Sequence, residues 1–237
     1  MTDQARVPGT SRRVLDALLF MAGSPLETLR WAHHRSQRNH VERFCRPLDK
    51  IFPGIGGTSI ALAGAEGLAG EVFDRDLMYL CLLAKHLNPT RTLEIGTLYG
   101  RTTLNLAMNT TEAARIWTVD LGAAEIGIGK QPADVGMKFR NTPFAGKITQ
   151  IIHDSRTLDL DPLLPLDLVF IDGDHRYQSV KQDTLKCLPA IRRGGVLAWH
   201  DYGLSEDVTA WLDESRATRG LDIWCLPESC VAVHRRP

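Results

Sequence analysis

The sequence lacks an excess of charge of either sign. Its 237 residues include 28 Lys and Arg against 28 Asp and Glu, so the formal net charge is zero. A protein whose partner is nucleic acid or an anionic lipid surface usually carries a basic excess. The charge balance therefore disfavours both kinds of partner, and we expect neither.

Long apolar runs are also missing. The longest apolar stretch, Val14–Ala22, is interrupted by Asp16, whereas a membrane span needs about 18–20 apolar residues. Its uninterrupted part, Ala17–Ala22, is shorter than the roughly 7–15 residues of a secretion signal. We therefore expect a cytoplasmic protein without a membrane segment.

Cysteines are few and form no motif. The sequence contains five cysteines, an odd number, which are scattered along the chain, and no two have the C-x-x-C spacing. Disulfide frameworks and zinc sites need paired or closely spaced cysteines. We interpret these residues as free thiols in a reducing compartment.

The sequence predicts an N-terminal helical extension over residues 1–60. Two helical patterns occur there, at Ser11–Ala22 and at Pro25–Arg46, the second opened by a Ser-Pro pair typical of a helix start. The run Pro53–Gly57 then breaks the chain, so we place the boundary near residue 60. Two uses of this extension stay open: pairing subunits into a homo-oligomer, or covering the active site.

From residue 61 to 237, short apolar runs alternate with helical patterns. Helices are predicted at Val72–Leu87, Thr102–Met108 and Tyr177–Leu188. Strands are predicted at Arg91–Ile95, Arg115–Val119, Lys147–Ile152, Asp167–Ile171 and Gly195–Trp199, with a terminal hairpin of Leu221–Leu226 and Cys230–His234. This order is typical of an α/β fold. We predict a doubly wound, mostly parallel, seven-stranded Rossmann-like sheet with an antiparallel terminal hairpin.

A glycine-containing loop follows the first strand. Its pattern, Glu94-x-Gly96-x-x-x-Gly100, differs from the G-x-G-x-x-G that binds a dinucleotide pyrophosphate. Gly96 allows a sharp turn, and Gly100 lets the next helix approach closely. The carboxylate of Glu94 would repel a phosphate dianion and favour an amine or another cation.

Acidic or polar residues follow each of the other parallel strands. Ligands of such sheets bind beyond the carboxyl ends of the strands, so these side chains should converge on one site. Asp120 after the second strand suits ribose hydroxyls, and His153-Asp154-Ser155 after the third suit an adenine edge. The fourth and fifth strands are followed by Asp172-Gly-Asp-His175 and by His200-Asp201-Tyr202.

With these motifs together, residues 70–237 resemble the class I S-adenosylmethionine-dependent methyltransferases. The similarity is greatest to a branch of small-molecule O-methyltransferases. The first motif is shared by very many enzymes, while the Ile-Asp-Gly-Asp-His and Trp-His-Asp-Tyr motifs at residues 171–175 and 199–202 are more selective. The resemblance implies an enzyme that methylates a small hydroxylated acceptor.

The resemblance also implies roles for individual residues. Gly96, Thr97 and Gly100 would contact the amino-acid part of the cofactor, supported by Glu94. The residues implied in cofactor binding are, in full, Glu94, Gly96, Thr97, Gly100, Asp120, Leu121, Asp154 and Ser155. Asp172 would lie between the cofactor and the acceptor.

A metal site and a general base are implied at the last two strands. In metal-dependent relatives the ligands come from positions that are Asp172, His200 and Asp201 here. Those relatives often have an acidic residue in place of His200, so magnesium, another divalent ion and no ion all stay open. His175 follows Asp172 by three residues and could take the proton of the acceptor hydroxyl.

The stretch Gly122–Gly146 is longer than an ordinary connection, even with a helix near Val135–Asn141. Its Gly129-Lys130 pair resembles a P-loop, but Gln131 replaces the required Ser or Thr. We reject triphosphate binding and expect a lid over the acceptor, centred on Ile126–Lys130.

Two alternative functions stay open from sequence alone. The first is an NAD-type oxidoreductase on a similar sheet, which the missing third glycine disfavours. The second is a module that binds S-adenosylmethionine without catalysis, which the presence of both Asp172 and His175 disfavours.

Overall fold

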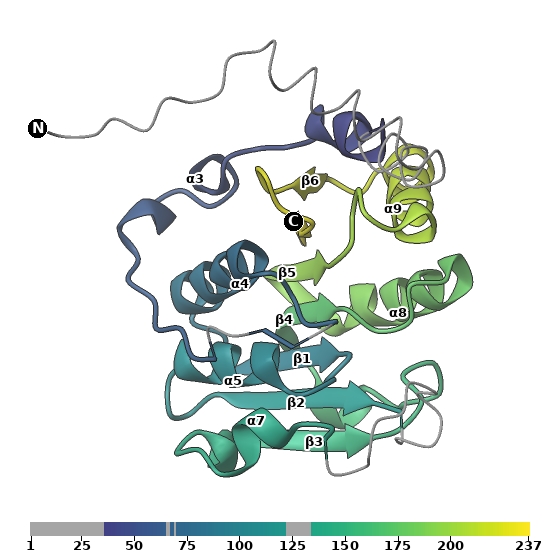
Figure 1. Ribbon diagram of the computed structural model, residues 1–237. Helices are drawn as coiled ribbons and strands as arrows, with labels where there is room; N and C mark the ends of the chain where they lie inside the picture. The colour runs from purple at the N-terminus through teal and green to yellow at the C-terminus, as the bar shows by residue number, and fades with distance from the viewer. Residues whose placement is uncertain (1–35, 65–66, 69, 122–133) are drawn as a thin grey trace, which may run out of the picture.

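A seven-stranded sheet forms the centre of the computed structural model, which describes residues 36–64, 67–68, 70–121 and 134–237 (Figure 1). The strand order is β3-β2-β1-β4-β5-β7-β6. The strands are β1 (Arg91–Ile95), β2 (Arg115–Asp120), β3 (Ile148–Ile152), β4 (Leu166–Ile171), β5 (Ile191–Trp199), β6 (Ile223–Cys225) and β7 (Ala232–Arg235). β1 to β5 pair in parallel, and β7 is antiparallel to both β5 and β6. The predicted fold class is confirmed.

Helices cover both faces of the sheet. On one face α4 (Asp74–Leu87) and α5 (Arg101–Met108) share a core with alternate residues of the central strands. On the other face α8 (Tyr177–Ala190) and α9 (Glu206–Arg219) do the same. The described residues also form short helical turns: α3 (Leu48–Ile51), α7 (Met137–Arg140), and the 3₁₀ turns Ile55–Gly57, Ala145–Lys147 and Asp161–Leu163.

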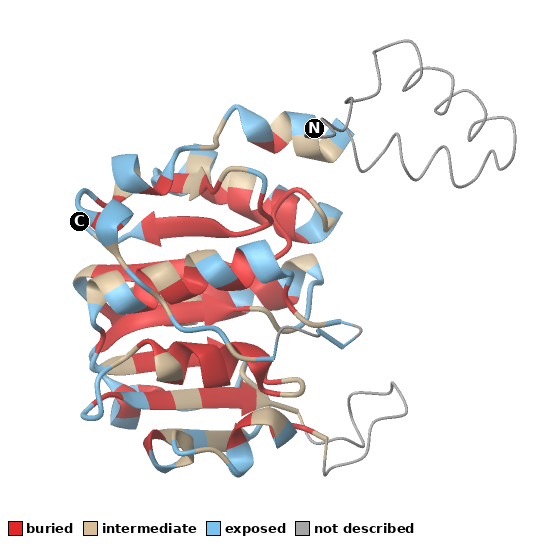
Figure 2. Ribbon diagram, turned by 60° about the vertical axis from the view of Figure 1, so that its left-hand side comes forward, coloured by how far each residue is buried: buried red, intermediate tan, exposed pale blue. Residues whose placement is uncertain are grey.

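The central strands are apolar because they are covered on both sides. All six residues of β4 are buried, and β5 is buried from Gly195 onward (Figure 2). The sequence of a strand covered on both faces is a continuous apolar run, without the alternation of apolar and polar residues seen in a half-exposed strand. The sequence Leu-Asp-Leu-Val-Phe-Ile of β4 has this pattern, with Asp167 as its polar exception.

The N-terminal extension is described only in part. The predicted helix Ser11–Ala22 lies outside the described residues, and so does half of Pro25–Arg46, of which residues 36–42 are helical. Beyond that helix, Cys45 forms an isolated parallel bridge with Cys225 of β6. The segment therefore extends the sheet locally at its β6 edge. No helix among the described residues is long and apolar enough to cross a bilayer.

The strand order reverses between β1 and β4. From β1 the chain runs outward to β2 and β3, then returns to place β4 on the other side of β1. The loops after β1 and β4 therefore diverge to opposite faces and leave a crevice at their carboxyl ends. The functional side chains gather at this crevice.

Candidate functional site

The loop after β1 lies directly against the end of β4. Gly96 has a φ of +102°, and a Cβ atom added to it would lie 2.0 Å from the backbone oxygen of Asp172. The amide of Asp172 in turn donates to the carbonyl of Ile95 at 2.8 Å. Only glycine permits this approach, because any side chain here would overlap the β4 backbone.

The backbone amides of this loop already donate within the protein. The amide of Gly96 donates to the carbonyl of Val119 at 2.8 Å. The amides of Thr97 and Leu98 both donate to Oδ2 of Asp120, at 3.0 and 2.7 Å. A pyrophosphate loop must offer free amides to its anion. This loop does not offer them, so its chemistry differs from that of a dinucleotide-binding loop.

One carboxylate oxygen of Asp120 thus stabilises the loop, and the other is available to a ligand. Leu98 has a positive φ of +47°, and its amide is held by the Asp120 carboxylate. Non-glycine residues adopt this conformation only when their surroundings impose it. Oδ1 of Asp120 has no hydrogen-bond partner among the described residues and remains available to a ligand in the cleft.

Glu94 lies beneath the loop rather than in the cleft. It is 1% exposed, and its Oε2 accepts hydrogen bonds from Thr103 and, at 2.6 Å, from Thr118. Burial outweighs these hydrogen bonds and raises the pKa of Glu94 to about 8. The residue links β1, β2 and α5 below the loop. This position suits the supporting role expected for it and gives it no contact with the cleft.

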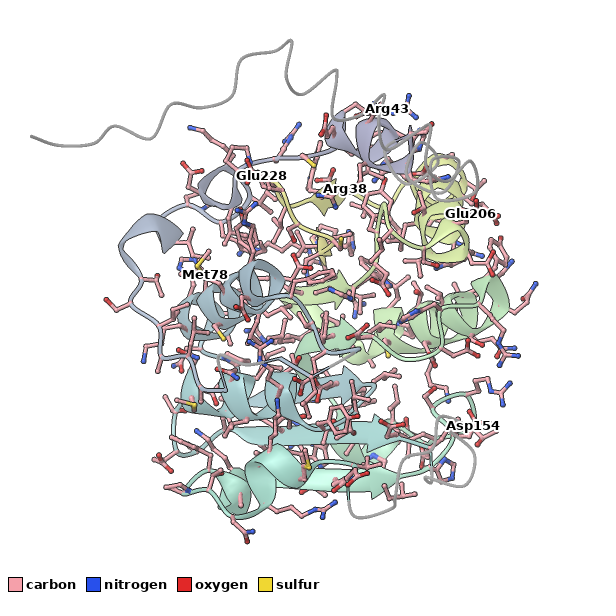
Figure 3. All side chains as sticks on the ribbon, in the orientation of Figure 1. Arg38, Arg43, Met78, Asp154, Glu206 and Glu228 are labelled. Carbon is pink, nitrogen blue, oxygen red and sulfur yellow. The ribbon has the colours of Figure 1, made fainter. Side chains whose placement is uncertain are left out.

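A cleft of about 1030 Å³ opens at the carboxyl ends of the parallel strands, at the upper end of the roughly 300–1000 Å³ of ligand pockets. Asp154 and Glu206, labelled in Figure 3, lie at two ends of this side of the sheet. The predicted site residues that line it are Gly96, Asp120, Leu121, Asp154, Ser155, Asp172, His175, His200 and Asp201. Thr97 lines a small adjoining pocket. Gly100 lines neither pocket and instead packs closely on Phe139.

The two carboxylates near Ser155 differ in their hydrogen bonds and in the direction of their pKa shifts. Both oxygens of Asp154 accept hydrogen bonds from the Arg156 guanidinium, which lowers the pKa of Asp154 to about 2. Asp183 on α8 is 2% exposed, and within the described part of the chain its Oδ1 has no hydrogen-bond partner. Burial raises the pKa of Asp183. Since Asp154 is already paired, Asp183 is the carboxylate with an unused oxygen at this end of the cleft.

Three potential metal ligands meet at the ends of β4 and β5. Ligand atoms of Asp172, His175 and Asp201 all lie within 4.8 Å of one another. Nε2 of His175 is 3.1 Å from Oδ2 of Asp201 and 3.6 Å from Oδ1 of Asp172. The hydrogen bond to Asp172 raises the pKa of His175 above its ordinary value, although burial opposes this.

His200 differs from His175 because both of its ring nitrogens face carboxylates. Nε2 is 2.9 Å from Oδ2 of Asp76, while Nδ1 is 3.1 Å from Asp201 and 3.4 Å from Asp172. Burial would lower the pKa of His200, but the three carboxylates raise it far above its ordinary value. A doubly donating imidazolium has no lone pair for a metal. The arrangement favours His175 over His200 as the third ligand beside Asp172 and Asp201.

Several cleft residues were not predicted from the sequence. Gly70, Glu71 and Phe73 reach the cleft from the segment before α4, and Leu204–Asp207 reach it from the start of α9. Asp76 supports His200 from within α4. From the sequence, site residues were predicted only at positions that follow a strand. Residues that precede the first strand were therefore not expected to line the cleft. The expected lid residues Ile126–Lys130 lie outside the described residues.

Comparisons with known proteins agree with this geometry. Residues 93–202 match a family model described as a methyltransferase domain. Among solved structures, the chain is similar to an O-methyltransferase from Bacillus cereus in complex with S-adenosylhomocysteine, with 18% identity, a TM-score of 0.53, and coverage of 71% of this chain and 84% of that one. It is also similar to the O-methyltransferase TomG from Streptomyces achromogenes, involved in tomaymycin synthesis and in complex with S-adenosylmethionine, with 15% identity, a TM-score of 0.57, and coverage of 83% and 99%. A search of curated proteins found no match.

The doubly wound sheet and its crevice define a class I methyltransferase fold. The match over residues 93–202 shows that the chain contains a methyltransferase domain. The interpretation as an NAD-type oxidoreductase is therefore set aside.

Proposed function

We propose that the protein transfers a methyl group from S-adenosylmethionine to a hydroxyl oxygen of a small molecule. The observation that carries the proposal is the loop after β1. Its backbone amides already donate hydrogen bonds to Asp120 and Val119, while carboxylates line the cleft beside the loop. Such a site repels a pyrophosphate and suits a cofactor that combines ribose hydroxyls with cationic groups.

The described residues fit this cofactor along the length of the cleft. Gly96 and Thr97 would contact its methionine part, because they line the pocket at the β1 end. Asp120 Oδ1 would accept hydrogen bonds from the ribose hydroxyls, and Leu121 and Ser155 would border the adenine. Glu94 and Gly100 would act indirectly, by supporting the loop and the packing of α7 on it.

The acceptor would enter beside the Asp172, His175 and Asp201 cluster. His175 has a side chain that is 50% exposed, so it can meet a substrate. As the hydroxyl oxygen attacks the methyl carbon in line with the breaking carbon–sulfur bond, His175 would take the hydroxyl proton. Positioning of the two reactants supplies most of the rate enhancement in such a displacement. Asp172 and Asp201 would stabilise the resulting imidazolium.

A divalent ion is the other way to activate the hydroxyl. Two carboxylates and one imidazole are a reasonable donor set for a divalent metal. Asp172, His175 and Asp201 would hold the ion. When bound, it would lower the pKa of the acceptor hydroxyl and so replace the general base.

A thermal-shift panel tests the cofactor assignment and the metal together. The protein would be heated with S-adenosylmethionine, S-adenosylhomocysteine or NAD, each with magnesium or with EDTA. A ligand at about 100 times its Kd adds roughly 2.7 kcal/mol, or very roughly 5–10 °C in Tm for a chain of this size. We expect the two adenosyl ligands to raise Tm. A shift with NAD alone would overturn the proposal.

A further inference from the structure

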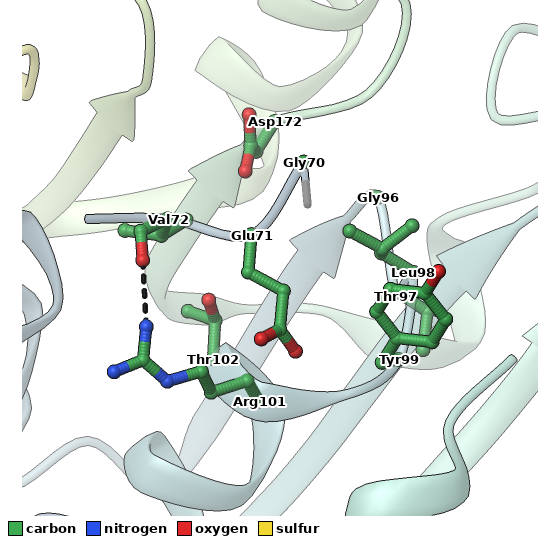
Figure 4. Close-up of a pocket in the computed structure, with 10 residues that line it drawn as sticks. All are labelled: Gly70, Glu71, Val72, Gly96, Thr97, Leu98, Tyr99, Arg101, Thr102 and Asp172. Atoms are coloured by element: carbon green, nitrogen blue, oxygen red, sulfur yellow. Dashed lines mark hydrogen bonds between the residues drawn. The ribbon is translucent and has the colours of Figure 1, made fainter. Parts of the chain in front are cut away.

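Glu71 is a buried carboxylate at the methionine end of the proposed cofactor site. Its side chain is only 3% exposed, and it lines both the main cleft and the small adjoining pocket. Figure 4 shows the side chain directed from the segment before α4 toward the loop that carries Thr97 and Tyr99. Its position is fixed from two sides, since Oε2 accepts hydrogen bonds from the amide of Leu68 at 2.6 Å and from Nζ of Lys138 at 2.7 Å.

The other oxygen of this carboxylate has no hydrogen-bond partner among the residues that the structure describes. Oε1 of Glu71 is buried and unsatisfied. Leaving a buried polar group unpaired costs about 1–3 kcal/mol, and more when the group is charged. Such atoms are rare in native proteins, and each one needs an explanation. A ligand that supplies the missing donor explains this one.

The adjoining pocket defines the size and charge of that donor. Its free volume is about 20 Å³, which is close to the space that one water-sized group needs. Glu71 and Asp172 line it with carboxylates, and the amides of Gly96, Thr97 and Leu98 already donate elsewhere. Arg101 also lines the pocket, but its guanidinium donates to the carbonyls of Gly64 and Val72 and to Asp74. The carboxylates are therefore left to accept from one small group, and a primary ammonium has the matching size, charge and donors.

We propose that Oε1 of Glu71 accepts a hydrogen bond from the α-ammonium of the cofactor's methionine part. This inference rests on the proposed S-adenosylmethionine site, because it uses the same orientation in the cleft. The Lys138 ammonium holds the carboxylate in place, so Glu71 selects the amino-acid end of the cofactor and fixes its direction. Glu71 is then a binding residue contributed from outside the strand-end motifs.

Titration calorimetry with two ligands and three forms of the protein tests the inference. The ligands are S-adenosylhomocysteine and its analogue with hydrogen in place of the α-amino group. The proteins are wild type, Glu71→Gln and Asp183→Asn. Asp183 is the matched control, since it too is a buried carboxylate with an unpaired oxygen, but at the Ser155 end of the cleft.

We expect wild type to bind S-adenosylhomocysteine at least about tenfold more tightly than the deaminated analogue. Glu71→Gln should lose about 10- to 100-fold in affinity for S-adenosylhomocysteine and bind the two ligands within about threefold of each other. Asp183→Asn should keep the wild-type preference for the amino group, whatever its overall affinity. Circular dichroism of each variant shows whether it is folded.

The possible outcomes distinguish failure of this inference from failure of the proposed function. If wild type binds both ligands equally, the inference is overturned while the cofactor assignment stands, and this holds even if Glu71→Gln does not fold. A folded Glu71→Gln variant that keeps the wild-type preference also overturns it. If wild type binds neither ligand, the proposed function itself fails.

Discussion

Nε2 of His200 lies 2.9 Å from Oδ2 of Asp76, and both side chains are buried. Oδ1 of the same carboxylate accepts a hydrogen bond from the amide of Cys230 at 3.1 Å. One aspartate of α4 therefore connects the end of β5 with the turn that precedes β7. Because Nδ1 of His200 faces Asp172 and Asp201, Asp76 also helps to orient the candidate metal ligands.

Removing Asp76 should destabilise the protein strongly. In Asp76→Ala, His200 loses its buried partner on one side and the Cys230 amide loses its acceptor. Breaking a buried ion pair by removing one partner costs about 3–5 kcal/mol. Urea denaturation of Asp76→Ala should show a loss of this size, and Asp49→Ala, at an exposed position of α3, should change stability by less than about 0.5 kcal/mol. A loss below about 1 kcal/mol for Asp76→Ala would show that the pair contributes little.

Glu94 should make stability fall as pH rises. Its pKa is about 8 in the folded protein against an ordinary value of 4.5. The folded state thus binds a proton more tightly, so the contribution to stability is complete below about pH 4.5 and is lost as pH rises through about 8. Glu94→Gln keeps an acceptor for Thr103 and Thr118 without the charge.

Thermal and urea unfolding of Glu94→Gln should therefore match wild type near pH 5 and exceed it near pH 9. On the order of 2–4 kcal/mol is expected for the difference between the two pH values. Glu112→Gln, at an exposed position, is the control and should show no such divergence. Parallel pH profiles for wild type and Glu94→Gln would contradict the role of burial at this residue.

Metal affinity should depend on His175. If Asp172, His175 and Asp201 hold a divalent ion, His175→Ala removes one of three ligands and should weaken Mn²⁺ binding by at least about tenfold. Electron paramagnetic resonance of free Mn²⁺ measures this directly. His153→Ala changes an exposed histidine of the same cleft and should leave the affinity unchanged. Equal Mn²⁺ binding by His175→Ala and wild type would remove His175 from the ligand set.

Gly96 should not tolerate even one added methyl group. A Cβ there would lie 2.0 Å from the Asp172 oxygen, and the φ of +102° is unfavourable for any other residue. We expect Gly96→Ala to lower the free energy of unfolding by more than about 3 kcal/mol, a loss typical of strain and overlap combined. Gly146→Ala has no atom within 4 Å of its added Cβ and is the matched control. Wild-type stability of Gly96→Ala in urea would contradict the close approach of β1 and β4.

The parallel part of the sheet could be predicted from local pattern. β1 has the predicted bounds because its sequence, Arg-Thr-Leu-Glu-Ile, lies between the chain-breaking residues Pro89 and Gly96. β5 begins at Ile191 rather than Gly195, since Arg192-Arg193-Gly194 has the composition of a turn although it continues the strand. Helix α9 was not predicted. Its composition is polar, and its start and end signals, Ser205 and Gly220, are single residues.

The site was predictable only where it follows strands. Asp120, Asp172 and Asp201 could be placed together because parallel strands end at one edge of a sheet. Glu71 and Asp76 reach the same edge through the packing of α4, which no local pattern encodes. The structure favours His175 instead of His200 as the third metal ligand because His200 pairs with Asp76. Asp76 lies 124 positions away from His200 in the chain.

A crystal structure of the protein soaked with S-adenosylhomocysteine would show directly where the cofactor binds. We expect the ligand to lie across the carboxyl ends of β1 and β2, with Oδ1 of Asp120 within hydrogen-bond distance of the ribose hydroxyls. Density for the ligand elsewhere, or an Asp120 carboxylate turned away from the ribose, would contradict this expectation.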